Sequence, residues 1–364
     1  MNAESKCIEV AGRTVGAGQK TFVIAELGVN HDGSAERAME LVALAAACGA
    51  DAVKLQLFRA ERLMHPSAKF AAYQRERVEA SDPIDMLRRY ELGDDAVADV
   101  VRSARRLNLV PLATPFSPED VYLIEQLDLP AVKVASPDLV NPVLLSRAAA
   151  LRRPLLVSTG AATMEEVART VGWVEAWNVP LALLHCVSSY PASTADANLN
   201  WIGELAGTFG VPVGYSDHTT VTSAGAVAVA VGACVVEKHL TYDRGAAGPD
   251  HSASADPQQF SRYVKLIREA EELRGGGACG KHVLPAEADV RAVSRQSLVL
   301  RRSLRRGEVV QSSDLTVQRP GTGIPAADID KVVGRRTLSP IAAGTLLAWD
   351  MLSRSVAKAV HDAA

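Results

Sequence analysis

Three scarcities in the sequence exclude several classes of protein. Aromatic residues are 5% of the 364 residues, there are only five cysteines, and the formal net charge is −3. No two cysteines form a C-x-x-C pair, a usage typical of free thiols in a reducing compartment, so we expect neither disulfides nor a thiolate zinc site. A charge this close to zero provides no broad positive field, so we expect no nucleic-acid partner. Any anion that is bound must be small and held locally.

The sequence also lacks a long hydrophobic run. The most apolar stretch, residues 221–236, contains Thr222, Ser223, Gly225 and Gly232. It is too short and too polar to cross about 30 Å of hydrocarbon. Residues 1–6 lack the apolar segment of a secretory signal. We therefore expect a cytoplasmic protein with no membrane partner.

What the sequence does contain is an alternation of short apolar runs and helix-like segments, the pattern of βα units around a parallel sheet. Eight units in about 250 residues fit a closed (β/α)8 TIM barrel better than an open sheet. No G-x-G-x-x-G motif follows any run, so the phosphate turn of a dinucleotide-binding fold is missing. The predicted fold class is therefore α/β, with a TIM barrel. The eight predicted strands are 22–26, 52–56, 110–114, 132–136, 155–158, 181–185, 211–216 and 235–239.

The barrel pattern stops at a glycine cluster at residues 275–277. We predict a barrel domain with an N-terminal hairpin over 1–278, a linker over 279–293, a small β-rich domain over 294–355 and a flexible tail over 356–364. The charged stretch 58–90 is too long for an ordinary βα connection, so we interpret it as an active-site lid or substrate loop. The strands expected in the small domain are 297–300, 308–310, 314–318 and 337–347.

Polar residues at the ends of the predicted strands should meet at one mouth of the barrel, where TIM barrels carry their reactive groups. Lys54 and Lys133 lie inside apolar strands, where an unpaired ammonium is costly, so they indicate an anionic ligand. Hydroxyl residues around them favour a ligand with both a phosphate and a carboxylate. The alternative is that both lysines form structural ion pairs with Glu26 and Asp138. The other residues expected at this mouth are Gln56, Thr114, Ser136, Ser158, Thr159, His185, Ser216, His218, Glu237, Lys238 and His239.

Two of these strand-end residues suggest a metal site. His218 and His239 are one βα unit apart, so their imidazoles lie at the ends of neighbouring strands. Two histidines completed by water and ligand oxygens suit a divalent ion such as Mn²⁺, Co²⁺, Fe²⁺ or Zn²⁺, and Mg²⁺ also fits. From spacing alone, two unrelated hydrogen-bonded histidines explain the pattern equally well.

A series of short motifs follows in order along nearly the whole chain. They include Glu26-x-Gly28-Val29-Asn30-His31, Lys54-Leu55-Gln56, Thr114-Pro115-Phe116, Lys133-Val134-Ala135-Ser136, Ser158-Thr159-Gly160, Gly214-Tyr215-Ser216-Asp217-His218, Glu237-Lys238-His239 and Gly248-Pro249-Asp250-His251. Together they resemble the motifs of the N-acetylneuraminate (sialic acid) synthases. The later Arg319-Pro320-Gly321-Thr322-Gly323-Ile324 resembles the signature of the antifreeze-like (β-clip) domain that ends those enzymes.

The resemblance implies a condensation of phosphoenolpyruvate with an open-chain aldose of the N-acetylmannosamine type, giving a nine-carbon 2-keto acid and phosphate by C–O cleavage. It implies that Asp138 assists the attacking water and that Glu26, Lys54 and Lys133 are catalytic. It assigns the phosphoenolpyruvate site to the two lysines with Thr114, Ser136, Ser158 and Ser216, and sugar contacts to Glu26, Gln56, Tyr190 and Asp250. Ser188 takes a substrate-binding place that is Asn in some members.

The same resemblance implies a metal and a partner subunit. His218 and His239 would carry Mn²⁺ or Mg²⁺. The chain would form a homodimer with swapped C-terminal domains, in which Arg319 reaches the sugar in the other subunit.

The acceptor sugar stays open. Residues 79–86 lack the asparagine and the Tyr-Glu pair that bacterial sialate synthases carry near this position. A related synthase acting on a precursor of legionaminic acid, pseudaminic acid or a specialised metabolite is therefore an alternative. A catalytically silent sugar-binding protein is a further alternative, which the retained lysines and histidines disfavour.

Overall fold

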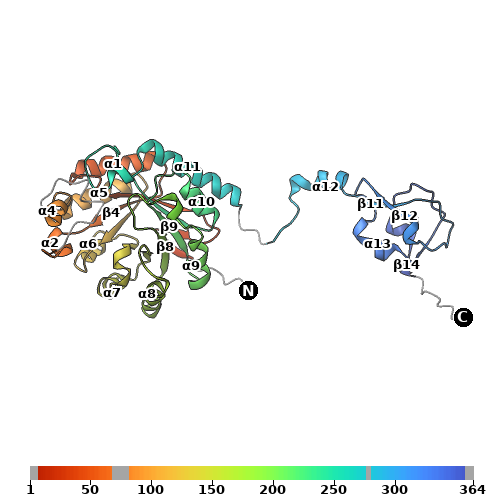
Figure 1. The fold of residues 1–364 in the computed structure, drawn as a ribbon, viewed down its shortest axis with the longest axis horizontal. Helices are drawn as coiled ribbons and strands as arrows, with labels where there is room; N and C mark the ends of the chain where they lie inside the picture. The colour runs from red at the N-terminus through yellow and green to blue at the C-terminus, as the bar shows by residue number, and fades with distance from the viewer. Residues whose placement is uncertain (1–6, 68–81, 276–279, 357–364) are drawn as a thin grey trace. The chain divides into compact units, whose positions relative to one another are not determined.

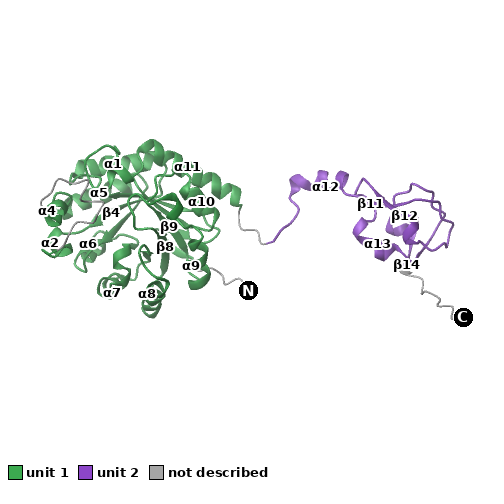
Figure 2. Cartoon of the chain, in the orientation of Figure 1, with its two compact units in different colours: residues 1–278 green, residues 279–364 purple. Residues whose placement is uncertain are grey.

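The computed structural model describes residues 7–67, 82–275 and 280–356. The chain divides into two compact units, residues 1–278 and 279–364, each of which is described by itself (Figures 1 and 2). Residues 79–81 of the altered loop and nearly all of the expected tail, 357–364, lie outside the described residues. None of the described helices is long and apolar enough to cross a membrane.

The first unit is a closed barrel of eight parallel strands, which confirms the predicted fold. Each strand is buried on both faces, which explains the continuous apolar runs in the sequence. The strands pair around the barrel in the order β10-β3-β4-β5-β6-β7-β8-β9. Their bounds are β3(Phe22–Gly28), β4(Ala52–Leu57), β5(Val110–Pro115), β6(Val132–Val134), β7(Leu155–Ser158), β8(Leu181–Cys186), β9(Val213–Asp217) and β10(Val235–His239).

Helices surround the strands, as Figure 1 shows. Ser34 caps the first of them by accepting a hydrogen bond from the Arg37 backbone N–H, and Thr163 forms a capping box with Glu166. The helix after β5 begins at Asp120, and the Ser117 side chain donates to the Asp120 carboxylate in the preceding turn. The helices are α1(Ala35–Ala47), α2(Ala60–Leu63), α4(Pro83–Arg88), α5(Asp94–Arg106), α6(Asp120–Gln126), α7(Pro142–Ala149), α8(Met164–Ala176), α9(Trp201–Phe209), α10(Ala224–Ala230) and α11(Pro257–Arg274).

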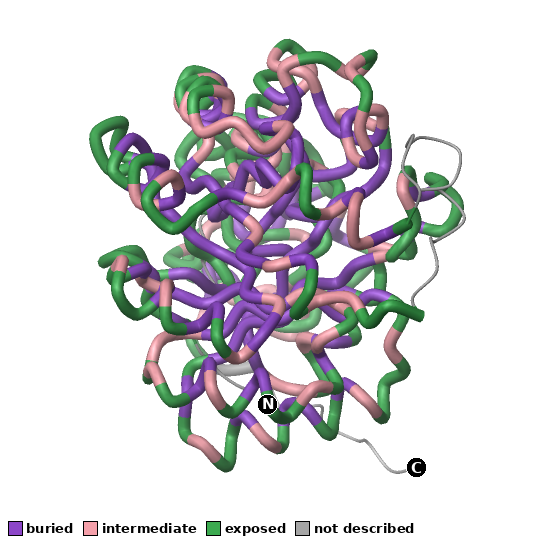
Figure 3. The backbone as a smooth tube through the Cα atoms, turned by 90° about the vertical axis from the view of Figure 1, so that its left-hand side faces the viewer, coloured by how far each residue is buried: buried purple, intermediate pink, exposed green. Residues whose placement is uncertain are grey.

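Two apolar cores hold this unit together. The larger lies between the outer faces of the strands and the helices. The smaller fills the amino-terminal half of the barrel interior, where Ile24, Leu112 and Leu156 meet. A hairpin of β1(Ile8–Val10) and β2(Arg13–Val15) packs into this smaller core. Figure 3 shows buried residues concentrated in the strands and exposed residues on the outside of the helices. The polar mouth is therefore left at the carboxyl ends of the strands.

The second unit has a small apolar core of its own, which includes Leu298, Leu315 and Leu347. The predicted strands 297–300 and 314–318 form a two-stranded pair. The predicted strands 308–310 and 337–347 were wrong. Only Thr337 of these segments belongs to a strand, and the rest make isolated bridges because turns interrupt them. Part of the segment expected as a linker, residues 288–293, is helical. The elements are α12(Ala288–Ser294), β11(Ser297–Leu300), β12(Leu315–Gln318), α13(Ile329–Val332), β13(Arg335–Thr337) and β14(Leu352–Val356).

Candidate active site

A cavity of about 430 Å³ opens at the carboxyl ends of the barrel strands. Alternate residues of a strand point to opposite faces, so the barrel register decides which side chains reach it. Glu26 on β3 is paired with Lys54 on β4, and Glu237 on β10 is paired with Ser216 on β9. Most of the predicted residues line this cavity: Glu26, Lys54, Gln56, Thr114, Lys133, Ser136, Ser158, Ser188, Tyr190, Ser216, His218, Glu237, His239 and Asp250.

Four buried charged groups form the floor of the cavity. The Lys54 ammonium lies 3.3 Å from Glu26 and 3.2 Å from Glu237. The Lys133 ammonium lies 3.8 Å from the other carboxylate oxygen of Glu237. All four side chains are at most 6% exposed. Glu237 thus bridges two lysines that the solvent hardly reaches.

This arrangement separates the pKa values of the two carboxylic acids. Burial raises the pKa of Glu26 to about 7, because Lys54 only partly offsets the lost hydration and Glu237 adds repulsion. Burial also opposes the charged form of Glu237, but Lys133 and Lys54 outweigh it and lower the pKa of Glu237 to about 2. Burial lowers the pKa of Lys133 to about 8. Near neutral pH, two cations therefore face one full carboxylate and one that is partly protonated.

The alternative that each lysine has its own carboxylate partner, Glu26 or Asp138, is only half right. Lys54 does contact Glu26, but Lys133 donates to Ser158 Oγ at 2.7 Å and faces Glu237. Asp138 is on a 3-10 helix (Ser136–Val140) after β6, where its carboxylate accepts from Asn141 at 3.0 Å. Burial raises the pKa of Asp138, and Asp138 is not among the described residues that line the cavity.

Hydrogen-bond donors and hydroxyl groups surround Lys133. The Gly160 backbone N–H donates to Ser136 Oγ at 3.0 Å, and Ser136 in turn donates to Cys186 Sγ at 3.5 Å. A side chain on Gly160 would collide with Ser188, since an added Cβ would lie 2.2 Å from its Oγ. The Thr114 hydroxyl is buried and has no hydrogen-bond partner among the described residues. This wall offers several polar groups to a ligand oxygen.

The two histidines singled out by their spacing lie side by side at the cavity, at the ends of the neighbouring strands β9 and β10. The ring centroids of His218 and His239 are 5.6 Å apart, and the Tyr190 ring lies 4.2 Å from His218 and 6.2 Å from His239. His218 Nδ1 is 3.0 Å from the Val187 carbonyl, so that nitrogen is engaged and Nε2 is the one that can bind a ligand.

His239 is suited to bind a cation as a neutral imidazole. Its Nδ1 is buried without a hydrogen-bond partner among the described residues and lies 3.9 Å from Asp250. Burial, reinforced by His218 and Lys54, lowers its pKa well below the ordinary value. The two imidazoles fit a divalent ion whose other ligands come from substrate or water. Within residues 7–67, 82–275 and 280–356, three or more His, Cys, Asp or Glu side chains nowhere form a metal-binding group.

The stretch 58–90 contributes a wall of the cavity through its described parts. The residues that line it are Leu63 at the end of α2, Met64 just after it, Met86 and Leu87 on α4, and Tyr90. Side chains at this location can contact a bound substrate, as expected of a substrate loop. Residues 68–81 lie outside the described part of the chain.

Several predicted mouth residues are placed elsewhere. Lys238 points away from the cavity, because it alternates with Glu237 and His239, and it pairs with Asp217 at 2.9 Å. His185 does not line the cavity, and its Nε2 lies 2.7 Å from the Ala197 carbonyl oxygen. The Thr159 hydroxyl donates to the Leu184 carbonyl.

Sequence reasoning underestimated one residue. Glu237 was expected at the mouth but not assigned a role, although it contacts both lysines. A glutamate within an apolar strand, in a barrel whose other strands contain two lysines, is a signal that could have identified it.

The chain is similar to known proteins over most of its length. Residues 41–278 match the NeuB family and residues 295–353 match the SAF domain. The chain is 38% identical over 341 residues to N,N'-diacetyllegionaminic acid synthase of Legionella pneumophila subsp. pneumophila, covering 92% of this chain and 95% of that protein. It is 31% identical over 329 residues to N-acetylneuraminate-9-phosphate synthase of Homo sapiens, covering 90% and 91%.

A solved structure has the same fold. N-acetylneuraminic acid (sialic acid) synthetase of Leptospira borgpetersenii serovar Hardjo-bovis, in complex with citrate, superposes with a TM-score of 0.72 at 29% identity, covering 79% of this chain and 95% of that one. The motif order, the barrel and these matches agree. The chain therefore belongs to the NeuB family and ends in an SAF domain, as the sequence motifs predict.

Proposed function

We propose that this protein condenses phosphoenolpyruvate with an open-chain N-acylated aldose, giving a nine-carbon 2-keto sugar acid of the sialic acid type and phosphate. The main support is the buried pair of Lys54 and Lys133, which share the single carboxylate of Glu237. Since Glu26 is partly protonated near neutral pH, this floor carries uncompensated positive charge. A small ligand with a phosphate and a carboxylate neutralises it and accepts hydrogen bonds from the surrounding hydroxyls.

The proposed reaction needs three things from the protein. The lysines, with Thr114, Ser136, Ser158 and Ser216, hold phosphoenolpyruvate so that its C3 faces the aldehyde carbon. When C3 attacks, the aldehyde oxygen becomes an alkoxide, and Glu26 is suited to give it a proton because its pKa is near neutrality. Water then adds to the cationic C2, and phosphate leaves with the bridging oxygen. Because Asp138 does not line the cavity, it can take the proton of the attacking water only through a further water molecule.

We propose that His218 and His239 hold the divalent ion of this reaction, Mn²⁺ or Mg²⁺. This assignment is supported by His239 Nδ1, which has no hydrogen-bond partner among the described residues, and by His218, whose Nδ1 is engaged by Val187 so that Nε2 is the nitrogen for a ligand. Such an ion supplies Lewis-acid polarisation of the aldehyde. Gln56, Ser188, Tyr190 and Asp250 are the groups of the chain that face the acceptor on that side.

The proposal extends to the second unit by the same family resemblance. We propose a homodimer with swapped C-terminal domains, in which Arg319 of one subunit binds the acyl group of the sugar in the other. Mixed dimers that carry an inactive barrel in one chain and Arg319→Ala in the other test this, because part of the activity should return.

A second acceptor class is favoured by one comparison. The relative that is 38% identical over 92% of this chain is a legionaminic acid synthase. A diacetamido aldose is therefore a candidate alongside N-acetylmannosamine, and the substrate loop is where the two would be distinguished.

The proposed function is tested by phosphate release from phosphoenolpyruvate with Mn²⁺ or Mg²⁺ and a panel of aldoses. We expect a keto acid only with N-acylated aldoses, loss of turnover after chelation, and its return with metal. Phosphoenolpyruvate labelled with ¹⁸O at the bridging position should pass the label to phosphate. Label retained in the keto acid, or no consumption with any aldose, would refute the proposal.

A further inference from the structure

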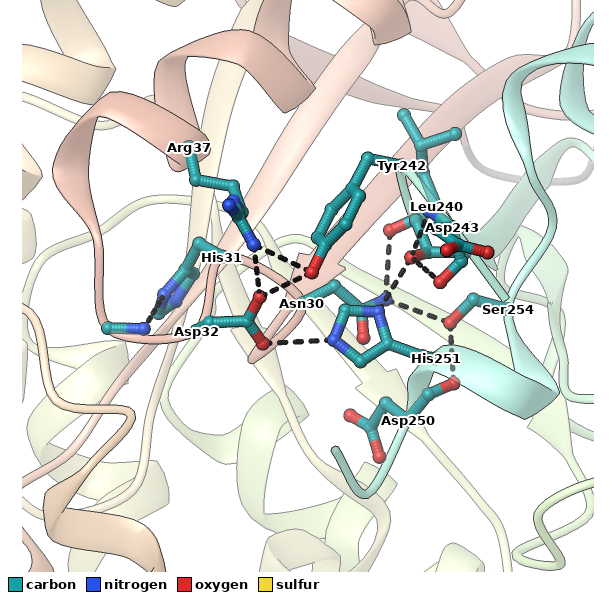
Figure 4. A network of polar contacts seen from close by, with 12 residues as sticks. Asn30, His31, Asp32, Arg37, Leu240, Tyr242, Asp243, Asp250, His251 and Ser254 are labelled. Atoms are coloured by element: carbon teal, nitrogen blue, oxygen red, sulfur yellow. Dashed lines mark hydrogen bonds and ion pairs between the residues drawn. The ribbon is translucent and has the colours of Figure 1, made fainter. Parts of the chain in front are cut away.

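A partly buried polar network joins the loops that follow β3 and β10 (Figure 4). At its centre is His251, which is 1% exposed. Its Nε2 lies 2.9 Å from an Asp32 carboxylate oxygen, and its Nδ1 lies 2.7 Å from the Thr241 hydroxyl. A carboxylate can only accept, so Nε2 carries a proton and donates it to Asp32. One imidazole thus ties together residues 219 positions apart in the sequence.

Asp32 is a firmly held anchor for this imidazole. Its second oxygen accepts from the Tyr242 hydroxyl and from Arg37, each at 2.8 Å, and Arg37 also donates to Tyr242 at 2.6 Å. Burial opposes the charge of Asp32, but the hydrogen bonds from His251, Tyr242 and Arg37 lower its pKa overall. The loop after β3 therefore presents a fixed carboxylate to the loop after β10.

The residue held by this network lines the active-site cavity. Asp250 immediately precedes His251, and its carboxylate lies 3.9 Å from His239 Nδ1. Its backbone carbonyl accepts from Ser254 Oγ at 2.7 Å, and Ser254 accepts from Asn30 at 2.8 Å. The backbone of Asp250 is therefore held at two points, by Ser254 at its carbonyl and by the side chain of the next residue.

The network lies across the barrel from Lys133. In the strand order, β3 is four strands from β7 and β10 is four strands from β6, so these pairs are on opposite walls. Lys133 and Ser158 come from β6 and β7. Displacing the loop of Asp250 should therefore disturb one side of the cavity and leave the Lys133 side in place.

We propose that the His251–Asp32 pair is a positioning device that fixes Asp250 for binding of the acceptor sugar, separately from the grip on phosphoenolpyruvate. This proposal rests on the proposed function. It gives His251 no contact with a substrate, so its effect must appear in the acceptor KM and not in the phosphoenolpyruvate KM.

The test compares steady-state kinetics of His251→Leu, His251→Gln and the wild type. Because a small displacement of a binding group is costly, we expect His251→Leu to raise the acceptor KM by about tenfold or more, with the phosphoenolpyruvate KM changed by less than about twofold. His251→Gln keeps a donor toward Asp32 and should recover most of the loss. The matched control is His185→Gln, a buried histidine outside the network, which should leave both KM values unchanged.

Urea unfolding of each variant shows whether it is folded. If His251→Leu does not fold, Asp32→Asn takes its place, since it keeps the side-chain volume, and it should show the same split between the KM values. Equal increases in both KM values, or none in a folded variant, would overturn the positioning role alone. A wild-type protein that consumes no phosphoenolpyruvate would overturn the proposed function and this inference with it.

Discussion

Replacing Glu237 by glutamine is the most direct test of the charged floor. Glu237 is the one carboxylate that contacts both Lys54 and Lys133 among the described residues, at 3.2 and 3.8 Å. Glutamine keeps the volume and can still accept the hydrogen bond that Ser216 donates at 3.1 Å. The substitution therefore removes a negative charge and little else, and Lys54 keeps Glu26 as a partner.

The magnitude follows from the distance. At 3.8 Å and an effective dielectric constant of about 20, the attraction between Lys133 and Glu237 is about 4 kcal/mol. Since 1.36 kcal/mol corresponds to one pH unit, losing it lowers the pKa of Lys133 by about three pH units. Burial already brings that pKa to about 8. In Glu237→Gln it should fall to about 5, which leaves Lys133 uncharged at neutral pH.

The assay is kcat/KM for phosphoenolpyruvate between pH 5 and pH 9.5. Protonated Lys133 attracts the anion, so activity should be lost as pH rises through its pKa. The wild type should decline near pH 8 and the variant near pH 5, which at pH 7.5 is a loss of about two orders of magnitude. Lowering the pH should restore part of the variant's activity.

Glu237→Asp is the matched control, because it keeps the charge and should decline near the wild-type pH. A Glu237→Gln profile that still declines near pH 8 would show that Glu237 does not hold the proton on Lys133. The electrostatic reasoning would then be wrong.

Three further substitutions test other parts of the structure. Lys54→Met leaves two buried carboxylates without their shared cation, so it should lower the free energy of unfolding in urea by about 3–5 kcal/mol; a variant as stable as the wild type contradicts the pairing. Gly160→Ala places a methyl group 2.2 Å from Ser188 Oγ, so it should raise the KM for phosphoenolpyruvate, and an unchanged KM would show that this wall yields. Asp51→Ala removes a buried carboxylate that pairs with Arg13, so it should lower the free energy of unfolding by about 2–4 kcal/mol; altered KM values in the folded variant would count against its structural role.

The barrel and its mouth were predictable because each strand is an apolar run that ends in polar residues. Lys54 and Lys133 attracted attention for the same reason, since a cation inside such a run needs a partner. Which partner it finds depends on how the barrel closes. Glu237 is far from both lysines in the sequence, and only the pairing of β10 with β3 brings it beside Lys54.

The errors have physical causes as well. Lys238 was placed at the mouth although strand alternation turns it outward, toward Asp217. The strands of the second unit are only three to five residues long, so turns dominate their pattern. The link between His251 and Asp32 leaves no local signal, because each residue alone looks like part of a loop.

The N-terminal hairpin affects how substrates enter the barrel and how products leave it. Its apolar residues pack into the core at the amino-terminal end of the strands, so among the described residues the cavity is reached from the carboxyl ends of the strands. Lys133 and Ser158 are each 2% exposed, whereas Asp250 and Tyr190 are nearer the outside. Under the proposed chemistry, a sugar bound at the cavity opening covers the ligand that is bound beneath it at the lysines. Substrate binding must then be ordered, with phosphoenolpyruvate first. Phosphate can dissociate only after the nine-carbon product has dissociated.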